Sequence, residues 1–137
     1  TLLKAPIAIV DKRGDEDQSI LDDQVTIIGD VKGRRCIVFD DMIDTGRKMA
    51  LAARSLKAAG ATDIYACATH PIFSKGAVER LQDSEYTQVV VSDTIQIPEE
   101  KQFAKLRVLS VSKTFAKAID LIYHNQSVDS LFTKQNL

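Results

Sequence analysis

A group of acidic residues between positions 40 and 44 has the types and spacing to bind a sugar. Asp40 and Asp41 follow the uninterrupted apolar run 36–39, which is typical of a central parallel strand. The sequence therefore places both carboxylates at the carboxyl end of that strand. Carboxylates in this position can bind sugar hydroxyls, or Mg²⁺ through water, so the sequence predicts a polar ligand site at the strand end.

The next three residues, Asp44, Thr45 and Gly46, predict a short turn that leads into a helical pattern. The first N–H groups of a helix have no intrahelical partner, and such groups bind phosphate. Each residue alone has a plainer explanation, because acids can end a strand and Asp44 or Thr45 can cap a helix. The acids and the turn together indicate a phosphorylated sugar.

The elements that must position this group follow from an alternation of buried-type strands and amphipathic helices. Gly60 is expected to end the first helix, and Ser74 to cap the second. We expect strands at 5–10, 25–28, 36–39, 64–69, 89–91 and 106–109, and helices at 47–59, 74–81 and 111–122. The turn residues 29–33 allow a hairpin or a short crossover. The pattern predicts an α/β fold, with a mostly parallel sheet and helices on both faces in a Rossmann-like three-layer arrangement.

The segment 11–23 is strongly acidic, with six acids against two bases, and the sequence predicts a mobile loop there. Two interpretations stay open. The loop is a solvated linker, or it closes over a reacting phosphate and brings Lys12 and Arg13 to it.

Composition bounds the class of protein. The 137 residues are 45% hydrophobic and 27% charged, which is enough for one domain over 1–137. A net charge of −1 lacks the basic excess of a nucleic-acid binder, and no apolar run approaches the roughly 20 residues of a membrane span. Cys36 and Cys67 lack metal-type spacing, and His70 has no second ligand nearby. We therefore expect a soluble, cytoplasmic protein with reduced thiols, no nucleic-acid or membrane partner, and a structural or substrate-adjacent His70.

The stretch 40–46 resembles the phosphoribosyl pyrophosphate loop of proteins with the type I phosphoribosyltransferase fold: two acids, two mostly apolar residues, then Asp-Thr-Gly. Further stretches, at 9–13, 27–33, 68–74, 89–91 and 127–132, are similar to the C-terminal half of the ribose-phosphate pyrophosphokinase family. The resemblance implies a single C-terminal phosphoribosyltransferase-like domain, a fragment that lacks the family's N-terminal domain with its histidine magnesium ligand and much of its ATP site.

The resemblance also implies roles. The substrates would be ribose 5-phosphate and ATP, the cofactor Mg²⁺ with no direct ligand in this chain, and the assembly a homo-oligomer, usually a hexamer. The implied residues are Lys12 and Arg13 for catalysis, Asp40 and Asp41 for the ribose hydroxyls and the magnesium water shell, Asp44, Thr45, Gly46, Arg47 and Lys48 for the 5-phosphate, and Ser127 and Phe132 for an allosteric site.

Three residues depart from the family pattern and keep alternatives open. Gly14 stands where the family places a second arginine, and Arg47 and Lys48 replace a glycine and a threonine of the phosphate turn. One hypothesis is an enzyme that makes phosphoribosyl pyrophosphate in the full-length parent, with the fragment inactive alone. The alternative is a catalytically weak paralogue that acts as a regulatory or assembly subunit. A base-salvage phosphoribosyltransferase ranks last, because the base-covering hood is not evident.

Overall fold

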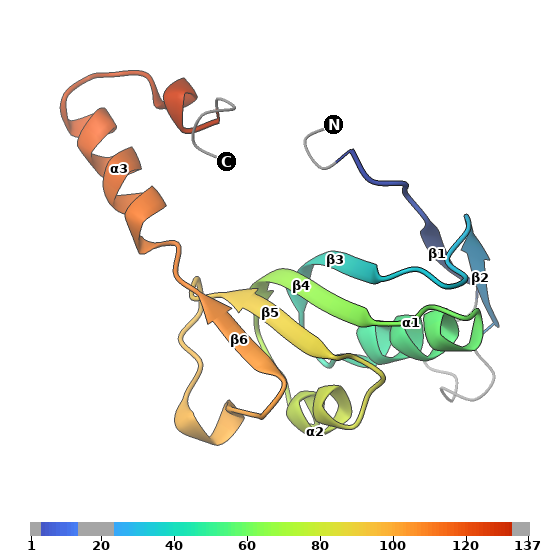
Figure 1. Ribbon diagram of the computed structural model, residues 1–137. Helices are drawn as coiled ribbons and strands as arrows, with labels where there is room; N and C mark the ends of the chain where they lie inside the picture. Colours follow the sequence, from blue (N-terminus) through green and yellow to red (C-terminus); the bar gives the residue numbers. More distant parts are fainter. Residues whose placement is uncertain (1–3, 14–23, 133–137) are drawn as a thin grey trace.

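The computed structural model describes residues 4–13 and 24–132 (Figure 1). Its strands are β1 (Ile9–Arg13), β2 (Gln24–Ile28), β3 (Cys36–Ile43), β4 (Ile64–Pro71), β5 (Gln88–Ser92) and β6 (Leu106–Leu109). Its helices are α1 (Arg47–Ala58), α2 (Ala77–Gln82) and α3 (Ser112–Tyr123), with short 3₁₀ turns η1 (Glu99–Lys101) and η2 (Val128–Phe132).

The central element is a parallel sheet in the order β3-β4-β5-β6. One row of paired residues crosses this sheet from Val38 through Ala66 and Val89 to Leu106. The last three of these residues are buried in the core. Sequential parallel strands need a crossover between each pair, and α1 and α2 provide two of these crossovers. The predicted α/β class with a parallel sheet is confirmed.

Both helices that pack on this sheet lie on the same face (Figure 1). On α1 the buried side chains include Met49, Ala53 and Leu56, which recur at helical spacing and join the core cluster. On the opposite face Ile37 and Phe39 of β3 are 53% and 65% exposed. The second helical layer expected from the sequence is therefore not seen among the described residues.

β1 and β2 form a separate antiparallel pair, in which Lys12 lies opposite Val25. The expected strand at 5–10 was therefore placed too early, and the backbone of Lys12 and Arg13 is in a strand instead of a loop. Pairing with β2 explains the shift, because an isolated strand has no partner for its backbone groups. The sequence allowed a hairpin or a short crossover between β2 and β3. Neither is formed, because β2 and β3 belong to different sheets. The remaining part of the expected mobile loop, 14–23, lies outside the described residues.

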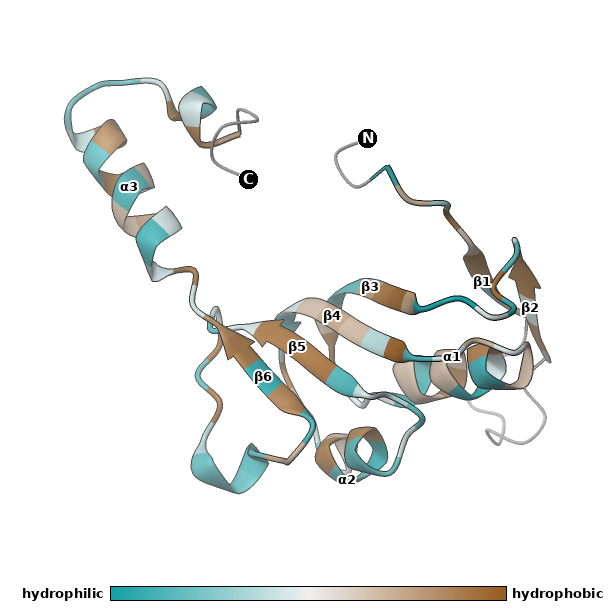
Figure 2. Cartoon of the chain, viewed as in Figure 1, coloured by the Kyte–Doolittle hydropathy of each residue, from teal (hydrophilic) through white to brown (hydrophobic). Residues whose placement is uncertain are grey.

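α3 projects away from the sheet (Figure 1). Its apolar stripe falls at the predicted positions, yet Phe115, Ile119 and Ile122 are 58%, 66% and 65% exposed. Figure 2 shows hydrophobic residues on α3, which stands apart from the sheet. Asn125 follows the C-cap residue of α3 with a positive φ of 54°, as is common just beyond a helix end. The η2 turn lies next to α3, and none of its residues is buried.

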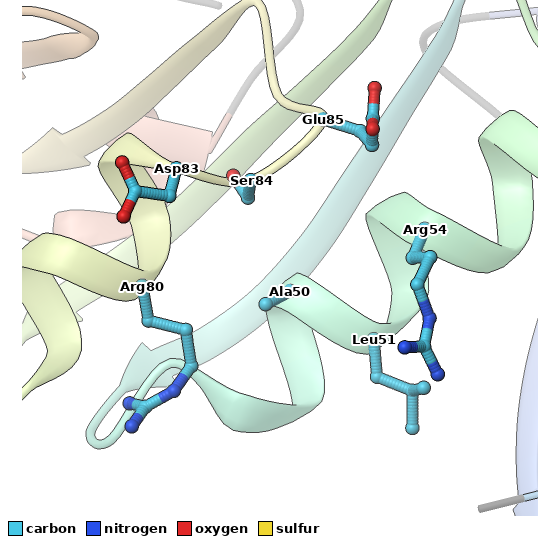
Figure 3. A pocket seen from close by; sticks show the side chains of 7 residues that line it. All are labelled: Ala50, Leu51, Arg54, Arg80, Asp83, Ser84 and Glu85. Atoms are coloured by element: carbon cyan, nitrogen blue, oxygen red, sulfur yellow. The ribbon is translucent and has the colours of Figure 1, made fainter. Parts of the chain in front are cut away.

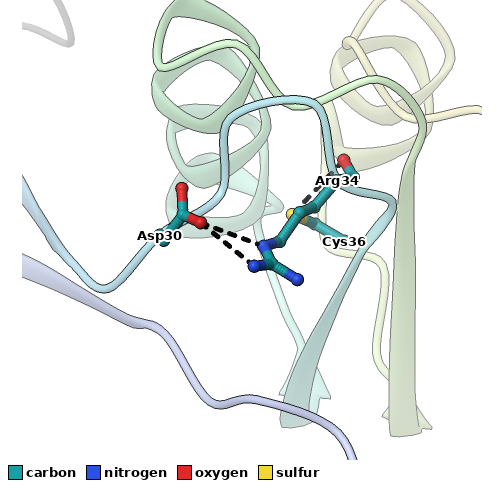
Figure 4. Close-up of polar contacts among 3 residues, drawn as sticks. All are labelled: Asp30, Arg34 and Cys36. Carbon is teal, nitrogen blue, oxygen red and sulfur yellow. Dashed lines mark hydrogen bonds and ion pairs between the residues drawn. The ribbon is translucent and has the colours of Figure 1, made fainter.

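The connection from β2 to β3 contains a charged pair on its surface (Figure 4). The Arg34 guanidinium donates from Nε and Nη2 to Asp30 Oδ2, at 3.2 and 3.1 Å. The Cys36 thiol lies 3.9 Å from the Arg34 carbonyl oxygen. Burial raises the pKa of the Cys36 thiol, and the Arg34 charge partly offsets this. Cys36 is therefore a protonated structural residue near neutral pH.

Within the described part of the chain, no helix combines the length and apolar character needed to cross a membrane.

Candidate functional site

Asp40 and Asp41 lie inside β3, because the strand continues to Ile43. The prediction that the strand ends at residue 39 is therefore wrong by four residues. The ladder to β4 explains the extension, since Asp40 pairs with Ala68 and Ile43 with Pro71. Ile43 is only 1% exposed, so its burial favours keeping the strand intact beyond the acids. The two carboxylates still occupy the last half of a strand.

The two acids are exposed and bind the local backbone. Asp40 Oδ1 accepts the N–H of Asp41 at 2.9 Å, and Asp41 Oδ1 accepts the N–H of Met42 at 2.8 Å. These bonds leave the other carboxylate oxygens for a ligand.

Asp40 also lies near a buried phenol. Tyr86 is 1% exposed and donates its hydroxyl to the Met49 carbonyl oxygen at 2.8 Å. Burial raises the pKa of Tyr86 far above its ordinary value, and the negative charge of Asp40 raises it further. Tyr86 therefore stays protonated and ties α1 to the loop that precedes β5. It stabilises the site's scaffold without titrating.

The predicted turn leads directly into α1. Gly46 is the N-cap residue in a left-handed conformation, with φ 72°. The plainer alternative was a cap by Asp44 or Thr45. Gly46 instead holds the N-cap position without a side-chain hydrogen bond, and Thr45 Oγ1 accepts a long hydrogen bond of 3.5 Å from the Arg47 N–H. The first turn of α1 contains no acid. An anion at this helix start therefore meets backbone N–H groups without a competing acidic side chain in the first turn.

Arg47 and Lys48 occupy the first turn of α1, as predicted, and both side chains are exposed. Residue 47 is the first helical residue, and a helical backbone suits arginine, so the missing glycine does not distort the turn. The two cations and the helix dipole add positive potential at the same place.

Ser74 and Arg80 belong to the site although sequence reasoning did not place them there. Ser74 was expected to cap the second helix, but Gly76 holds that position. The Ser74 hydroxyl instead donates to Asp44 Oδ1, and Arg80 Nη1 donates to the Thr45 carbonyl oxygen. These partners are 30 and 35 positions apart, so only the packing of α2 reveals them.

His70 is held by a hydrogen-bond network at the ends of β4 and β5. Its Nδ1 lies 2.9 Å from Thr94 Oγ1, and Thr94 Oγ1 donates to the Thr69 carbonyl oxygen at 2.9 Å. This arrangement agrees with the expected structural or substrate-adjacent role. Among residues 4–13 and 24–132, no group of three or more His, Cys, Asp or Glu side chains could hold a metal ion.

The backbone of the other predicted site residues belongs to elements outside the sugar loop. Lys12 and Arg13 lie on β1, in the separate pair of strands. Ser127 and Phe132 lie beyond α3, which carries them away from the sheet (Figure 1), and Phe132 is 76% exposed. The described geometry thus unites only the sugar-loop residues, 40–48.

Comparison with known proteins identifies the family of this domain. The profile of the phosphoribosyl synthetase-associated domain family matches residues 14–133. The chain belongs to this family. The family's domain therefore covers the sugar loop, α1, α2 and α3.

Individual relatives agree with the family assignment. A curated relative from Lactiplantibacillus plantarum, named putative ribose-phosphate pyrophosphokinase 2, is 52% identical over 96% of this chain and 40% of its own length. The ribose-phosphate pyrophosphokinase of Caldanaerobacter subterraneus is 47% identical over 96% of this chain and 41% of its own length. The relative from Listeria innocua is 45% identical over 95% of this chain and 40% of its own length. The chain thus spans about two fifths of the length of these relatives.

A solved structure supports the same fold. The crystal structure of phosphoribosylpyrophosphate synthetase from Mycobacterium smegmatis matches with a TM-score of 0.73 and 40% identity. The match covers 74% of this chain and 34% of that chain. The parallel sheet of this synthetase-associated domain is therefore a known arrangement.

Proposed function

We propose that this chain is the C-terminal phosphoribosyltransferase-like domain of a ribose-phosphate pyrophosphokinase and binds ribose 5-phosphate. The observation that carries the proposal is the start of α1. The first helical turn has no acid, its N-cap Gly46 has no side-chain hydrogen bond, and it carries Arg47 and Lys48. It follows Asp40 and Asp41 in the last half of β3. A phosphate meets the amides of a helix start and positive charge there, while the sugar ring reaches the carboxylates.

The proposed reaction is diphosphoryl transfer from ATP. The sugar 1-hydroxyl attacks the β-phosphorus, the bond between the α- and β-phosphates breaks, and AMP leaves with the bridging oxygen. The products are phosphoribosyl pyrophosphate and AMP, and the hydroxyl proton passes to solvent. Such a transfer needs positioning and charge neutralisation more than a covalent nucleophile. In this chain the positioning is assigned to Asp40, Asp41 and residues 44–48, and charge neutralisation to Lys12 and Arg13.

Mg²⁺ is the proposed cofactor, and it would neutralise the phosphate charge. The exposed carboxylates of Asp40 and Asp41 suit an ion that keeps several of its waters, because they could bind those waters without coordinating the metal directly. Asp40 and Asp41 would then hold its water shell and the ribose hydroxyls together.

We further propose a homo-oligomer in the cytoplasm. The length of the relatives supports a larger polypeptide, and the free Cys36 and Cys67 are consistent with a reducing compartment. Ser127 and Phe132 would contribute to an allosteric site of that assembly.

The test uses the complete polypeptide that contains these residues. With Mg²⁺, ATP and ribose 5-phosphate, we expect formation of AMP and phosphoribosyl pyrophosphate in equal amounts. The double change Asp40→Asn and Asp41→Asn should abolish ribose 5-phosphate binding in calorimetry. Ribose 5-phosphate that binds both proteins equally would overturn the assignment of the site.

A second candidate function is a regulatory or assembly subunit with weak catalysis. It is favoured by Arg47 and Lys48, which stand at the start of α1 where the family has smaller residues. The change Arg47→Gly with Lys48→Thr should tighten ribose 5-phosphate binding if these residues impair the site. Equal or weaker binding after this change would favour the active enzyme.

A further inference from the structure

We propose that α2 and the residues leading into it form the support that sets the phosphate turn, with Ser74 and Arg80 as positioning residues. This inference rests on the proposed function, because it assigns how the sugar-phosphate site is held in its binding geometry. The turn residues 44–46 are each contacted by the same segment, 74–81.

Asp44 is held at two points by Ser74. The Ser74 hydroxyl donates to Asp44 Oδ1, and the Ser74 N–H donates to the Asp44 carbonyl oxygen at 3.0 Å. Directly before the turn, the Phe73 N–H donates to the Ile43 carbonyl oxygen, also at 3.0 Å. The turn is therefore bound to this segment by its backbone as well as by a side chain.

Thr45 is held by Arg80, whose Nη1 donates to the Thr45 carbonyl oxygen. The Thr45 carbonyl and the Gly46 N–H belong to one trans peptide unit, so they point in opposite directions. Directing the carbonyl toward α2 therefore directs the Gly46 N–H away from α2. An N–H fixed in this way is a preorganised phosphate donor.

Gly46 is held by close packing. A Cβ atom at this position would lie 3.3 Å from Leu81 Cγ and 3.6 Å from the Ala77 carbonyl oxygen. Ala77 and Leu81 are both 0% exposed, so the surface that the turn touches is part of the core. A support built on the core cannot shift without unpacking it.

The Arg80 side chain also borders a cavity between α1 and α2 of about 270 Å³ (Figure 3). Arg54 lines the same cavity from α1, with Ala50 and Leu51 beside it. The cavity gives small molecules access to the Arg80 position. Removal of the Arg80 side chain should extend this cavity toward Thr45, so we expect a guanidinium ion to enter and replace the deleted group.

The experiment compares Arg80→Ala with Arg54→Ala in the complete polypeptide. Arg80→Ala should raise the KM for ribose 5-phosphate about ten-fold, the usual scale for one lost hydrogen bond of this kind, and leave the KM for ATP unchanged. Arg80→Lys should retain most of the affinity, and millimolar guanidinium should restore Arg80→Ala, whereas urea should not. Arg54→Ala should change neither KM. Ser74→Ala should raise the ribose 5-phosphate KM by a smaller factor.

Two results would overturn the proposal. One is an unchanged ribose 5-phosphate KM in Arg80→Ala. The other is an equal rise in both KM values with a lower unfolding midpoint and no rescue by guanidinium, which would mean that Arg80 only stabilises the fold.

A ligand-free measurement separates this inference from the proposed function. The NMR amide signal of Gly46 should shift in Arg80→Ala and stay in place in Arg54→Ala. A wild-type protein that shows this response but binds no ribose 5-phosphate would overturn the proposed function and leave the support of the turn standing. An unresponsive Gly46 amide, with normal sugar-phosphate binding, would overturn the inference alone.

Discussion

The two faces of the parallel sheet differ sharply, although the same four strands form both. On one face α1 and α2 bury Leu56 and Leu81 to 3% and 0% exposure, and the phosphate turn is fixed against them. On the other face Ile37 and Phe39 stay open, and α3 projects outward with an exposed apolar stripe. The comparison shows that the candidate site is built on the packed face. Changes on that face should therefore alter both stability and the turn, whereas changes on the open face should have a smaller effect on stability and none on the turn.

The largest expected effect comes from Leu81→Ala. Removing a fully buried leucine side chain leaves a cavity, so the free energy of unfolding should fall by about 2–5 kcal/mol. Urea unfolding followed by circular dichroism measures this change. Ile37→Ala on the open face is the control and should cost less than about 1 kcal/mol, because its side chain is half exposed. Equal losses in the two variants would mean that the open face is covered by packing comparable to that of α2.

A smaller effect is expected from Gly46→Ala, which tests the close approach of the turn to α2. Alanine at φ 72° costs roughly 1–2 kcal/mol, and its Cβ would also press on Leu81. Gly33→Ala is a matched control, since Gly33 has φ 69° and a Cβ added there would meet no atom within 4 Å. Both variants share the backbone cost. The additional loss of unfolding free energy in Gly46→Ala therefore reports the contact with α2 alone, and equal losses would show that the contact is loose.

The sequence predicted the elements of the packed face well. The stripe on α1 and the apolar runs of β3 to β6 are local patterns, and local patterns follow from burial on a regular element. Gly60 also lies where a helix C-terminus needs a left-handed residue, with φ 90°. The sugar loop, Asp40 to Gly46, was likewise recognisable from the sequence, because its residues are consecutive.

What the sequence could not predict depends on pairing between distant segments. Ser74 resembles an N-cap by its local context. Its hydroxyl instead binds Asp44, because the turn after β3 lies beside the residues that lead into α2. Arg80 gave no local signal for a contact with Thr45. The stripe of α3 correctly predicted a helix but not its exposure, because periodicity identifies an apolar face and does not identify what covers it.

Disrupting α3 should have a still smaller effect on the sheet. Ala116→Pro removes a backbone N–H inside the helix and should unfold α3 locally. Because α3 does not pack on the sheet in this structure, the unfolding free energy of the sheet should change by less than about 0.5 kcal/mol. Hydrogen exchange resolved by residue measures both: faster exchange in α3, and unchanged protection in β4 and β5. Loss of protection in the strands would show that α3 docks on the sheet in solution.

The smallest expected effect concerns Asp93, which connects the sheet to the start of α3. Hydrogen bonds from the Ser110 side chain and from the Val111 N–H, the latter at 2.8 Å, lower the pKa of Asp93 below its ordinary value of 3.8. A lowered carboxyl pKa stabilises the connection above pH 3.8, and this stabilisation is lost as the pH falls through the lower folded value. The Val111 amide shift, followed by NMR, should therefore titrate below pH 3.8. Asp93→Asn keeps an acceptor oxygen but has no titrating charge, so its Val111 shift should stay constant over the same range. A wild-type midpoint at or above 3.8 would mean that the carboxylate does not hold α3 to the sheet.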